Sequence, residues 1–236
     1  MKITKAIILC AGFGKRLRPL TNTNPKPLLK IGNNTLLSNT LNILEHFGIK
    51  EVIINVHYLG DQIVDYIKKK RFNIKITTVN EKDKILDTGG GILNVLQHFL
   101  NEPFAVVNPD TIWNLNYLDE LKDMEKDFFM DNKNKCYLLV VNKKKSFDKS
   151  FKGDFNLKNN LINRKDKEDL DTIYTGLQII KPEVFNGLSE EVFAINRIWD
   201  KLIQKNELYG TESNIDFFHV STLDIYKRLL KKYFKH

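Results

Sequence analysis

Four cations and two glycines near the start of the chain have the types and spacing to bind a polyphosphate. The apolar run 6–10 predicts a buried strand, and it stops at Gly12 and Gly14. Glycine lets the backbone come close to a ligand, and backbone N–H groups beside cations are typical of phosphate-binding loops. The cations are Lys15, Arg16, Arg18 and Lys26. The alternative is a plain turn with solvated cations, which a lone Gly-x-Gly pair would favour.

Two known phosphate-binding loops are excluded by the residues around these glycines. The dinucleotide-binding fingerprint needs a third Gly or Ala where Leu17 stands. The P-loop needs Ser or Thr directly after Gly-Lys, and here Arg16 follows Gly14-Lys15. The loop therefore belongs to another class.

Two more groups of residues that could do chemistry follow apolar runs. Residues 86–91 read Leu-Asp-Thr-Gly-Gly-Gly, and the backbone there can approach a base or a ribose. A flexible turn is the alternative. Asp110 follows the apolar run 104–107 closely, where a carboxylate can bind Mg²⁺ together with substrate phosphate oxygens. Many aspartates after strands only form turns, which is the alternative at this position.

The apolar pattern predicts an α/β protein with a three-layer, Rossmann-like, mostly parallel sheet and helices on both faces. In the first half the predicted strands are 6–10, 52–56, 74–79 and 104–107, and the predicted helices are 35–48, 60–70 and 91–100. In the second half the predicted strands are 137–141, 173–180 and 217–220, the predicted helices are 196–204 and 222–234, and 151–171 should form hairpins and loops. Ligands of such sheets bind outside the carboxyl ends of the strands, so the three groups of residues above should converge on one rim.

Charge and cysteine content narrow the class of protein. The net charge of +8 suits an anionic ligand, but the lysines are scattered through the chain, so we do not expect nucleic-acid binding. Cys10 and Cys136 have no metal-ligand spacing and are expected to be reduced core residues of a cytoplasmic protein. We expect no signal peptide and no membrane span.

The loop at the start of the chain resembles the signature of the sugar-1-phosphate nucleotidyltransferase family. That signature is L-x-A-G-x-G-x-R-x-x-P-x-T followed by P-K-P, and this chain fills every position. The matching residues are Leu9, Ala11, Gly12, Gly14, Arg16, Pro19, Thr21, Pro25, Lys26 and Pro27. A match over so many fixed positions is far more specific than a glycine pair. The resemblance runs from Ala6 to about Ile225, and it implies the nucleotide-diphospho-sugar transferase type of α/β fold.

The resemblance implies that a phosphate oxygen of a sugar 1-phosphate attacks the α-phosphorus of a nucleoside triphosphate, and that pyrophosphate leaves. Arg16 would pair with the β- and γ-phosphates, Lys26 would lie near the α-phosphate, and Asp110 would bind the cofactor Mg²⁺. The residues expected at the nucleotide are Ala11, Gly12, Gly14, Glu81, Thr88, Gly89, Gly90 and Asn108. Because the attacking group is already an anion, we expect no protein nucleophile or strong base.

The far end of the chain departs from the family pattern. Many members carry Asp-x-Gly-Thr where this chain has His219-Val-Ser221-Thr, and their aspartate completes the metal site. We interpret His219 as a metal ligand beside Asp110, although a nitrogen donor suits Mg²⁺ less well than oxygen. Orientation of a metal-bound water, a contact to phosphate and a structural hydrogen bond are the alternatives. The number of metal ions is left open.

Other motifs resemble the branch of the family that uses N-acetylmuramate 1-phosphate. They are Leu-Asp-Thr-Gly-Gly-Gly-Ile at 86–92, Phe-x-x-Asn-Arg-x-Trp at 193–199 and His-Val-x-Thr at 219–222. We therefore expect UTP and N-acetylmuramate 1-phosphate as substrates, in peptidoglycan recycling. A mannose- or heptose-type sugar phosphate with GTP or CTP is the close alternative, and a non-catalytic regulatory subunit is the alternative of another class. The residues expected at the sugar are Gly153, Thr175, Gly176 and Asn196.

We expect one domain over residues 1–236, in which 1–112 mainly bind nucleotide and 113–236 form the sugar-binding part and a C-terminal helix. The expected partners are the two substrates, with neither nucleic acid nor a membrane. A monomer or a small homo-oligomer is expected.

Overall fold

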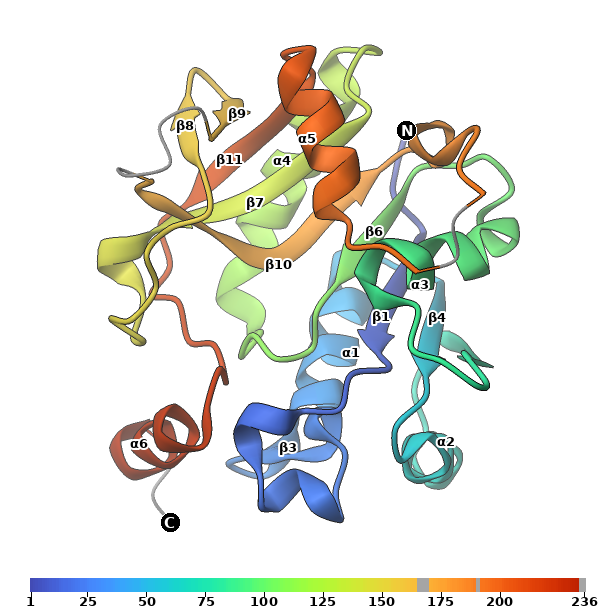
Figure 1. The fold of residues 1–236 in the computed structure, drawn as a ribbon, viewed down its shortest axis with the longest axis vertical. Helices are drawn as coiled ribbons and strands as arrows, with labels where there is room; N and C mark the ends of the chain where they lie inside the picture. Colours follow the sequence, from blue (N-terminus) through green and yellow to red (C-terminus); the bar gives the residue numbers. More distant parts are fainter. Residues whose placement is uncertain (165–169, 190–191, 234–236) are drawn as a thin grey trace.

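The computed structural model describes residues 1–164, 170–189 and 192–233, and within them nine strands form one mixed sheet (Figure 1). The strand order is β5-β4-β1-β6-β10-β7-β11-β9-β8. The mutually parallel strands of the first half are β1 (Lys5–Cys10), β4 (Glu51–Val56), β5 (Lys75–Asn80) and β6 (Phe104–Val107). Each of them matches a predicted strand closely.

The second half of the chain extends the same sheet. β10 (Thr172–Ile180) is antiparallel both to β6 and to β7 (Cys136–Asn142). β11 (Leu208–Ser213) is parallel to β7, and the hairpin of β8 (Asn156–Lys158) and β9 (Leu161–Asn163) lies at the edge. A separate two-stranded ladder joins β2 (Lys30–Ile31) and β3 (Asn34–Thr35).

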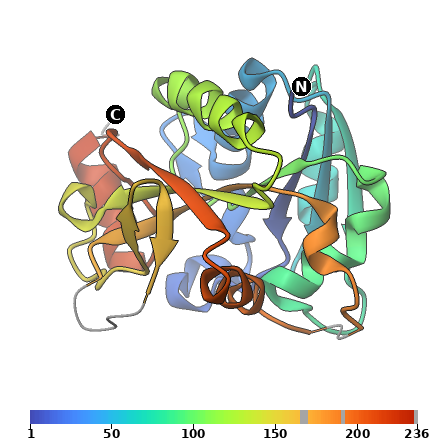
Figure 2. The same ribbon diagram turned by 90° about the horizontal axis from the view of Figure 1, so that it is seen from above.

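Helices cover both faces of the sheet, as predicted, and this arrangement confirms the α/β class (Figure 2). α1 (Leu36–Phe47), α2 (Gly60–Lys69) and α4 (Leu118–Met130) pack on one face. α3 (Asp87–Val95) and α5 (Asn196–Gln204) pack on the other. α6 (Leu223–Tyr233) belongs to a smaller third cluster. Short 3₁₀ segments lie at Lys15–Leu17, Leu20–Asn22, Lys26–Leu28, Leu96–Phe99, Leu115–Tyr117, Lys143–Lys145 and Pro182–Phe185.

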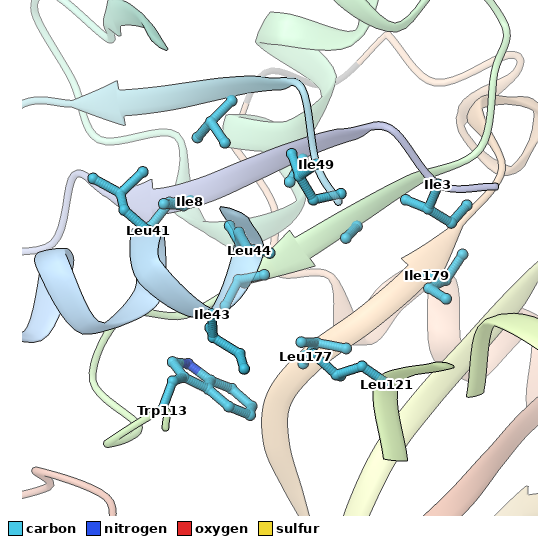
Figure 3. Packing of buried hydrophobic residues seen from close by; sticks show 14 of the residues in the cluster. Ile3, Ile8, Leu41, Ile43, Leu44, Ile49, Trp113, Leu121, Leu177 and Ile179 are labelled. Carbon is cyan, nitrogen blue, oxygen red and sulfur yellow. The ribbon is translucent and has the colours of Figure 1, made fainter. Parts of the chain in front are cut away.

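Alternation along the buried strands builds the two main cores. In β1, Ala6 and Ile8 point to the α1 side and Ile7 points to the α3 side, as expected because successive residues of a strand face opposite sides. Figure 3 shows Ile8 of β1 beside Leu41 and Leu44 of α1. An apolar cluster thus covers each face of the sheet.

Two local sequence features set the ends of α1. Thr35 and Ser38 form a capping box, in which each side chain bonds to the backbone N–H of the other residue. Gly48 ends the helix with φ +105°, a left-handed conformation that favours glycine. The predicted helix 35–48 is therefore confirmed, and it holds the sheet behind the loop that follows β1.

Three sequence predictions differ from the structure. Residues 217–220 form only isolated bridges, Ser146 with Phe217 and Thr111 with His219, because the segments on either side pair with them over too few residues to make a ladder. The helix predicted at 91–100 begins earlier, at Asp87, so the glycine run lies inside its first turns. α4 and β11 were not predicted at all. Part of the expected loop region, residues 165–169, lies outside the described residues.

None of the described helices is both long enough and apolar enough to cross a membrane.

We expect Gly89→Ala to destabilise the protein although alanine otherwise favours a helix. An added Cβ would lie 2.3 Å from Cε2 and 2.9 Å from the carbonyl oxygen of Phe193. Overpacking of this kind costs about 1–3 kcal/mol, which urea unfolding would measure. Gly12→Ala is the matched control, since nothing lies within 4 Å of its added Cβ, and it should change stability by less than about 0.5 kcal/mol. Equal losses in both variants would contradict the packing role of Gly89.

Candidate active site

A first cavity of about 350 Å³ lies where the carboxyl ends of β1 and β6 meet the start of α3. The three groups of residues predicted to converge on one rim therefore do so. The predicted residues in its wall are Ala11, Gly12, Gly14, Arg16, Lys26, Thr88, Asn108 and Asp110. Asn55 and Ser221 also line it and were not predicted as site residues.

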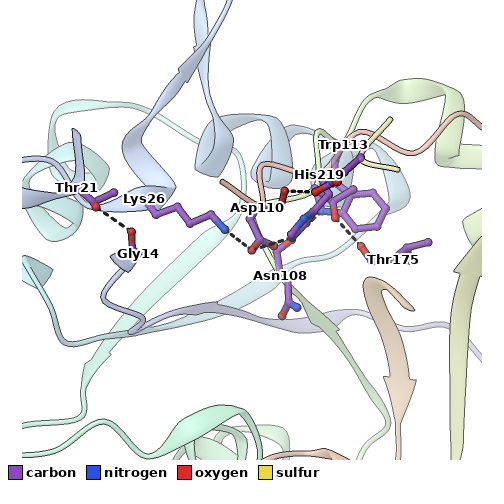
Figure 4. Close-up of polar contacts among 11 residues, drawn as sticks. Gly14, Thr21, Lys26, Asn108, Asp110, Trp113, Thr175 and His219 are labelled. Carbon is purple, nitrogen blue, oxygen red and sulfur yellow. Dashed lines mark hydrogen bonds and ion pairs between the residues drawn. The ribbon is translucent and has the colours of Figure 1, made fainter. Parts of the chain in front are cut away.

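The loop over residues 11–27, here called the signature loop, takes its shape from Gly14 and Thr21. Gly14 has φ +63°, and an added Cβ would lie 3.0 Å from Thr21 Cγ2. The Thr21 hydroxyl donates a hydrogen bond of 2.9 Å to the Gly14 carbonyl (Figure 4). Arg16 stays exposed, whereas Lys26 is half-buried between two buried prolines. The loop thus presents an exposed Arg16 and a half-buried Lys26 to the cavity.

Asp110 is the centre of a charged cluster in the cavity wall (Figure 4). Its Oδ2 lies 2.6 Å from Lys26 Nζ and 3.1 Å from His219 Nε2. Burial on its own raises the pKa of Asp110, but the charges of Lys26 and His219 outweigh it and hold that pKa well below its usual range. The carboxylate is therefore ionised at neutral pH.

His219 lies behind Asp110 rather than in the cavity wall. The backbone N–H of Val220 bonds to the Asp110 carbonyl, and that of Ile112 bonds to the Phe218 carbonyl, so the two segments are paired around the imidazole. The Phe217 ring stacks on it at 5.8 Å. His219 Nε2 faces the Asp110 carboxylate. This geometry favours a role in orienting Asp110 over the predicted role of His219 as a direct metal ligand.

The donor set at Asp110 fits a hard cation that is shared with a substrate. The second carboxylate oxygen, Oδ1, is buried and has no hydrogen-bond partner among the described residues. Within the same residues, no group of three His, Cys, Asp or Glu side chains could hold a metal ion. Mg²⁺ commonly takes one or two carboxylates and completes its shell with phosphate oxygens and water. A single carboxylate with a free oxygen therefore fits Mg²⁺, provided that the substrate supplies the phosphates.

Glu81, which is predicted to contact the base, bonds through both carboxylate oxygens within the protein. It does not line the first cavity, and its Oε1 accepts a 2.6 Å bond from Asn55 Nδ2, while Oε2 accepts a 2.9 Å bond from the Leu86 backbone. Asn55 in turn accepts a 2.9 Å bond from the Cys10 backbone. This buried network ties β1 and β4 to the entrance of α3, so both Glu81 oxygens are occupied within the protein.

The glycine run, which is predicted to contact the nucleotide, packs closely against neighbouring segments of the protein. The backbone N–H groups of Gly89 and Gly90 both donate to the Phe193 carbonyl, at 2.9 and 3.0 Å. An added Cβ on Gly91 would lie 2.8 Å from both Asn55 Nδ2 and Glu81 Oε1. Only Asp87 and Thr88 of this segment reach the first cavity. Spacing alone could not distinguish the approach of a ligand from that of a neighbouring side chain.

A second cavity of about 490 Å³ adjoins the first, and Leu9, Thr88 and Asn108 line both. Of the residues predicted at the sugar, Gly153 and Asn196 line this second cavity. Phe155, Tyr174 and Trp199 form an aromatic wall, in which the Trp199 ring centroid lies 5.6 Å from that of Phe155 and 4.8 Å from that of Tyr174. Arg164 and Gln178 line it too; neither belongs to a motif that the sequence would have revealed.

Thr175 and Gly176, the other two residues predicted at the sugar, do not line either cavity. The Thr175 hydroxyl donates to the Leu139 carbonyl, and its own carbonyl accepts a 2.6 Å bond from the Thr111 hydroxyl. Gly176 has φ +96°, and its carbonyl accepts a 2.7 Å bond from the Asn108 backbone. Both residues therefore hold the segment from Asn108 to Thr111 in place from behind.

Sequence comparison relates the chain to enzymes of known activity. A family model described as nucleotidyl transferase matches residues 5–150. The N-acetylmuramate alpha-1-phosphate uridylyltransferase of Caulobacter vibrioides is 27% identical over 220 residues, which cover 91% of this chain and 90% of that protein. The enzyme of the same name from Neisseria meningitidis serogroup B is 32% identical over 186 residues, 78% of each chain.

Structural comparison supports the fold. The crystal structure of HddC from Yersinia pseudotuberculosis complexed with GMP-PN has a TM-score of 0.76 at 21% identity, and the match covers 98% of this chain and 100% of that one. At this identity the likeness bears on the fold alone, and it agrees with the Rossmann-like sheet predicted from the sequence.

Ser221 holds the segment that carries His219, and its loss should weaken the protein in a pH-dependent way. Its hydroxyl donates to Asp148 Oδ2, and Ser150 donates to Oδ1 from both its hydroxyl and its backbone. Burial on its own raises the pKa of Asp148, but these hydrogen bonds outweigh it and lower that pKa. Ser221→Ala should lose about 1.5–3 kcal/mol at pH 7, the usual worth of a hydrogen bond to a charged group.

The sign of the pH effect follows from the lowered pKa. Ionised Asp148 contributes fully to the free energy of unfolding above the ordinary pKa of an aspartate, about 4. This contribution is lost as the pH falls through the lower pKa of Asp148 in the folded protein. The stability gap between wild type and Ser221→Ala should therefore shrink below about pH 4 in urea unfolding. A gap that is the same at pH 7 and at pH 3 would contradict the bond.

Proposed function

We propose that this chain transfers a uridylyl group from UTP to N-acetylmuramate 1-phosphate. The chain belongs to the nucleotidyl transferase family, as its resemblance predicted, and is a sugar-1-phosphate nucleotidyltransferase. The products are a UDP-sugar and pyrophosphate. Two relatives support this pair of substrates, because both carry the name of a uridylyltransferase of that sugar phosphate. The setting that we propose is peptidoglycan recycling in the cytoplasm.

The cluster of Lys26, Asp110 and His219 carries the proposal. Lys26 and Asp110 lie in the wall of the first cavity, and the neighbouring Asn108 is shared with the second. A triphosphate in the first cavity and a sugar phosphate in the second would meet at this shared wall. The two reacting anions are thereby brought together beside fixed charges, which lowers the entropic cost of their encounter.

The signature loop supplies charge to the phosphates. The backbone N–H groups of residues 11–14 and the Arg16 guanidinium bind the β- and γ-phosphates, and Lys26 stabilises the charge that gathers at the α-phosphorus. Cys10 also lines the cavity, but burial raises the pKa of its thiol far above the usual range, and the Asp110 charge adds to the effect. It therefore stays protonated, and the nucleophile is the sugar phosphate itself.

Asp110 is the residue that would hold Mg²⁺, through its free Oδ1. When bound, the ion would polarise the phosphates and offset their mutual repulsion. Lys26 and His219 keep the Asp110 carboxylate ionised, and both contact Oδ2, which leaves Oδ1 for the ion. Outer partners of this kind fix the orientation of a ligand without touching the metal.

We predict that UTP with N-acetylmuramate 1-phosphate gives the fastest release of pyrophosphate in a panel of nucleoside triphosphates and sugar 1-phosphates with Mg²⁺. Guanosine and cytidine triphosphates with mannose- or heptose-type phosphates are the competing pairs. A higher kcat/KM with one of these would replace the proposed substrates while keeping the reaction. Tight binding of nucleotide without turnover of any pair would instead indicate a regulatory protein.

We predict different metal responses for Asp110→Asn and His219→Gln. Asp110→Asn removes the proposed ligand and should lower kcat by more than about 100-fold and raise the Mg²⁺ concentration needed for half-maximal rate. His219→Gln removes only the orienting group and should cost about 10- to 100-fold. His46→Gln is the matched control, since His46 is exposed on α1. A larger metal dependence in His219→Gln than in Asp110→Asn would make His219 the ligand.

A further inference from the structure

We propose that Arg164 selects sugar 1-phosphates that carry a second anionic group, a carboxylate, on the sugar. The inference rests on the proposed function, because it takes the second cavity as the site of the sugar. It adds a specificity-determining residue that no motif of the sequence contains.

Arg164 enters the second cavity from the end of the β8–β9 hairpin. It directly follows β9 and is in the cavity wall. Its guanidinium carbon lies 4.9 Å from the ring centroid of Phe155, within the range of a cation–π contact. Its Nε lies 2.9 Å from Oδ1 of Asp200 on α5. The Asp200 contact is an ion pair without hydrogen-bond geometry, since Nε has no hydrogen-bond partner among the described residues. The ring contact and the ion pair together restrain the guanidinium before any ligand binds.

A terminal nitrogen of the same guanidinium is left without a partner among the described residues. Nη2 is buried and has no hydrogen-bond partner among the described residues. A guanidinium offers five N–H donors in a planar fork, and a buried donor without a partner is costly to keep. A ligand oxygen in the second cavity would satisfy it. The fork matches a carboxylate better than a hydroxyl, because it can donate two parallel bonds to the two carboxylate oxygens.

The other polar groups in this wall suit the uncharged parts of a sugar. Tyr174 Oη is a second buried group without a partner among the described residues, and Asn196 supplies an amide. Asp154, the other charged residue in the wall, already accepts a 2.9 Å bond from the Tyr174 backbone. Asp154 and Asp200 offset part of the Arg164 charge. The preference for a carboxylated sugar therefore comes from directed hydrogen bonds more than from net charge, and we expect a moderate difference in affinity.

The phosphate of the sugar 1-phosphate does not need Arg164. The first cavity is lined by the cations of the signature loop and by Asp110, the proposed metal ligand. Arg164 does not reach this cavity. Only Leu9, Thr88 and Asn108 are common to both walls. A phosphate that reacts at the shared wall leaves Arg164 facing a different part of the sugar. The charge of Arg164 is thus available for a second anionic group.

The test compares two sugars that differ by one substituent. N-acetylmuramate 1-phosphate carries a carboxylated ether that N-acetylglucosamine 1-phosphate lacks. Binding of each is measured by calorimetry, with Mg²⁺ and a non-reacting analogue of UTP present, so that the readout does not depend on turnover. The wild-type protein should bind the carboxylated sugar about 10- to 100-fold more tightly, the usual worth of hydrogen bonds between charged groups.

Arg164→Gln should remove this preference by weakening binding of the carboxylated sugar and leaving the other nearly unchanged. Arg164→Lys keeps the charge without the fork and should retain part of the preference. Lys158→Gln removes an exposed cation from the same hairpin and should change neither affinity. Far-UV circular dichroism and thermal unfolding show whether each variant is folded.

Two results would overturn the role of Arg164. One is a wild-type protein that binds both sugars equally. The other is an Arg164→Gln variant that loses affinity for both sugars to the same degree, which would mean that Arg164 serves their common part or only the fold. Binding with the expected preference but without turnover would instead refute the proposed function and leave the role of Arg164 intact.

Discussion

The contacts of the Asp110 carboxylate join three segments that are far apart in the sequence. Oδ2 lies 2.6 Å from Lys26 of the signature loop and 3.1 Å from His219 near the C-terminus. A largely buried carboxylate is costly on its own, so each of these segments depends on the others being in place. The C-terminal helix adds a further link between the end of the chain and the signature loop, since the Tyr226 hydroxyl on α6 donates a 2.7 Å bond to the Lys30 carbonyl just beyond that loop.

The sequence predicted those parts of the fold that depend on local pattern. β1, β4, β5 and β6 were found because apolar runs end at clear breaks, and α1 because a helix-stop glycine follows an apolar stripe. Residues 217–220 have the apolar content of a strand, yet they form only single bridges. Whether an extended segment becomes a strand depends on how many residues a neighbour in space pairs with it, which one sequence does not display.

Site residues were predicted where the chemistry of a motif indicates their role. They were missed where their role depends on which segments lie close together in the folded chain. Arg16, Lys26 and Asp110 share the wall of one cavity, as their charges had suggested. The glycines of the run 89–91 instead make room for Phe193 and for the Asn55–Glu81 network. Glycine spacing signals a close approach to the backbone without saying what approaches. Arg164 was missed for the converse reason, because a single cation after a short hairpin has no distinguishing spacing.

The charges of the first cavity explain why its cations differ in exposure. Its wall holds Lys15, Arg16 and Lys26 against Asp87 and Asp110. Lys26 is paired with Asp110 before any substrate binds, so its position is fixed and its charge is largely offset. Arg16 is exposed, and in the proposed reaction it would bind the triphosphate and then release the pyrophosphate to solvent. With the roles proposed above, a paired cation at the reacting phosphorus and an exposed one at the leaving group would suit a reaction whose product must depart, because tight binding at both ends would hold the pyrophosphate in the site.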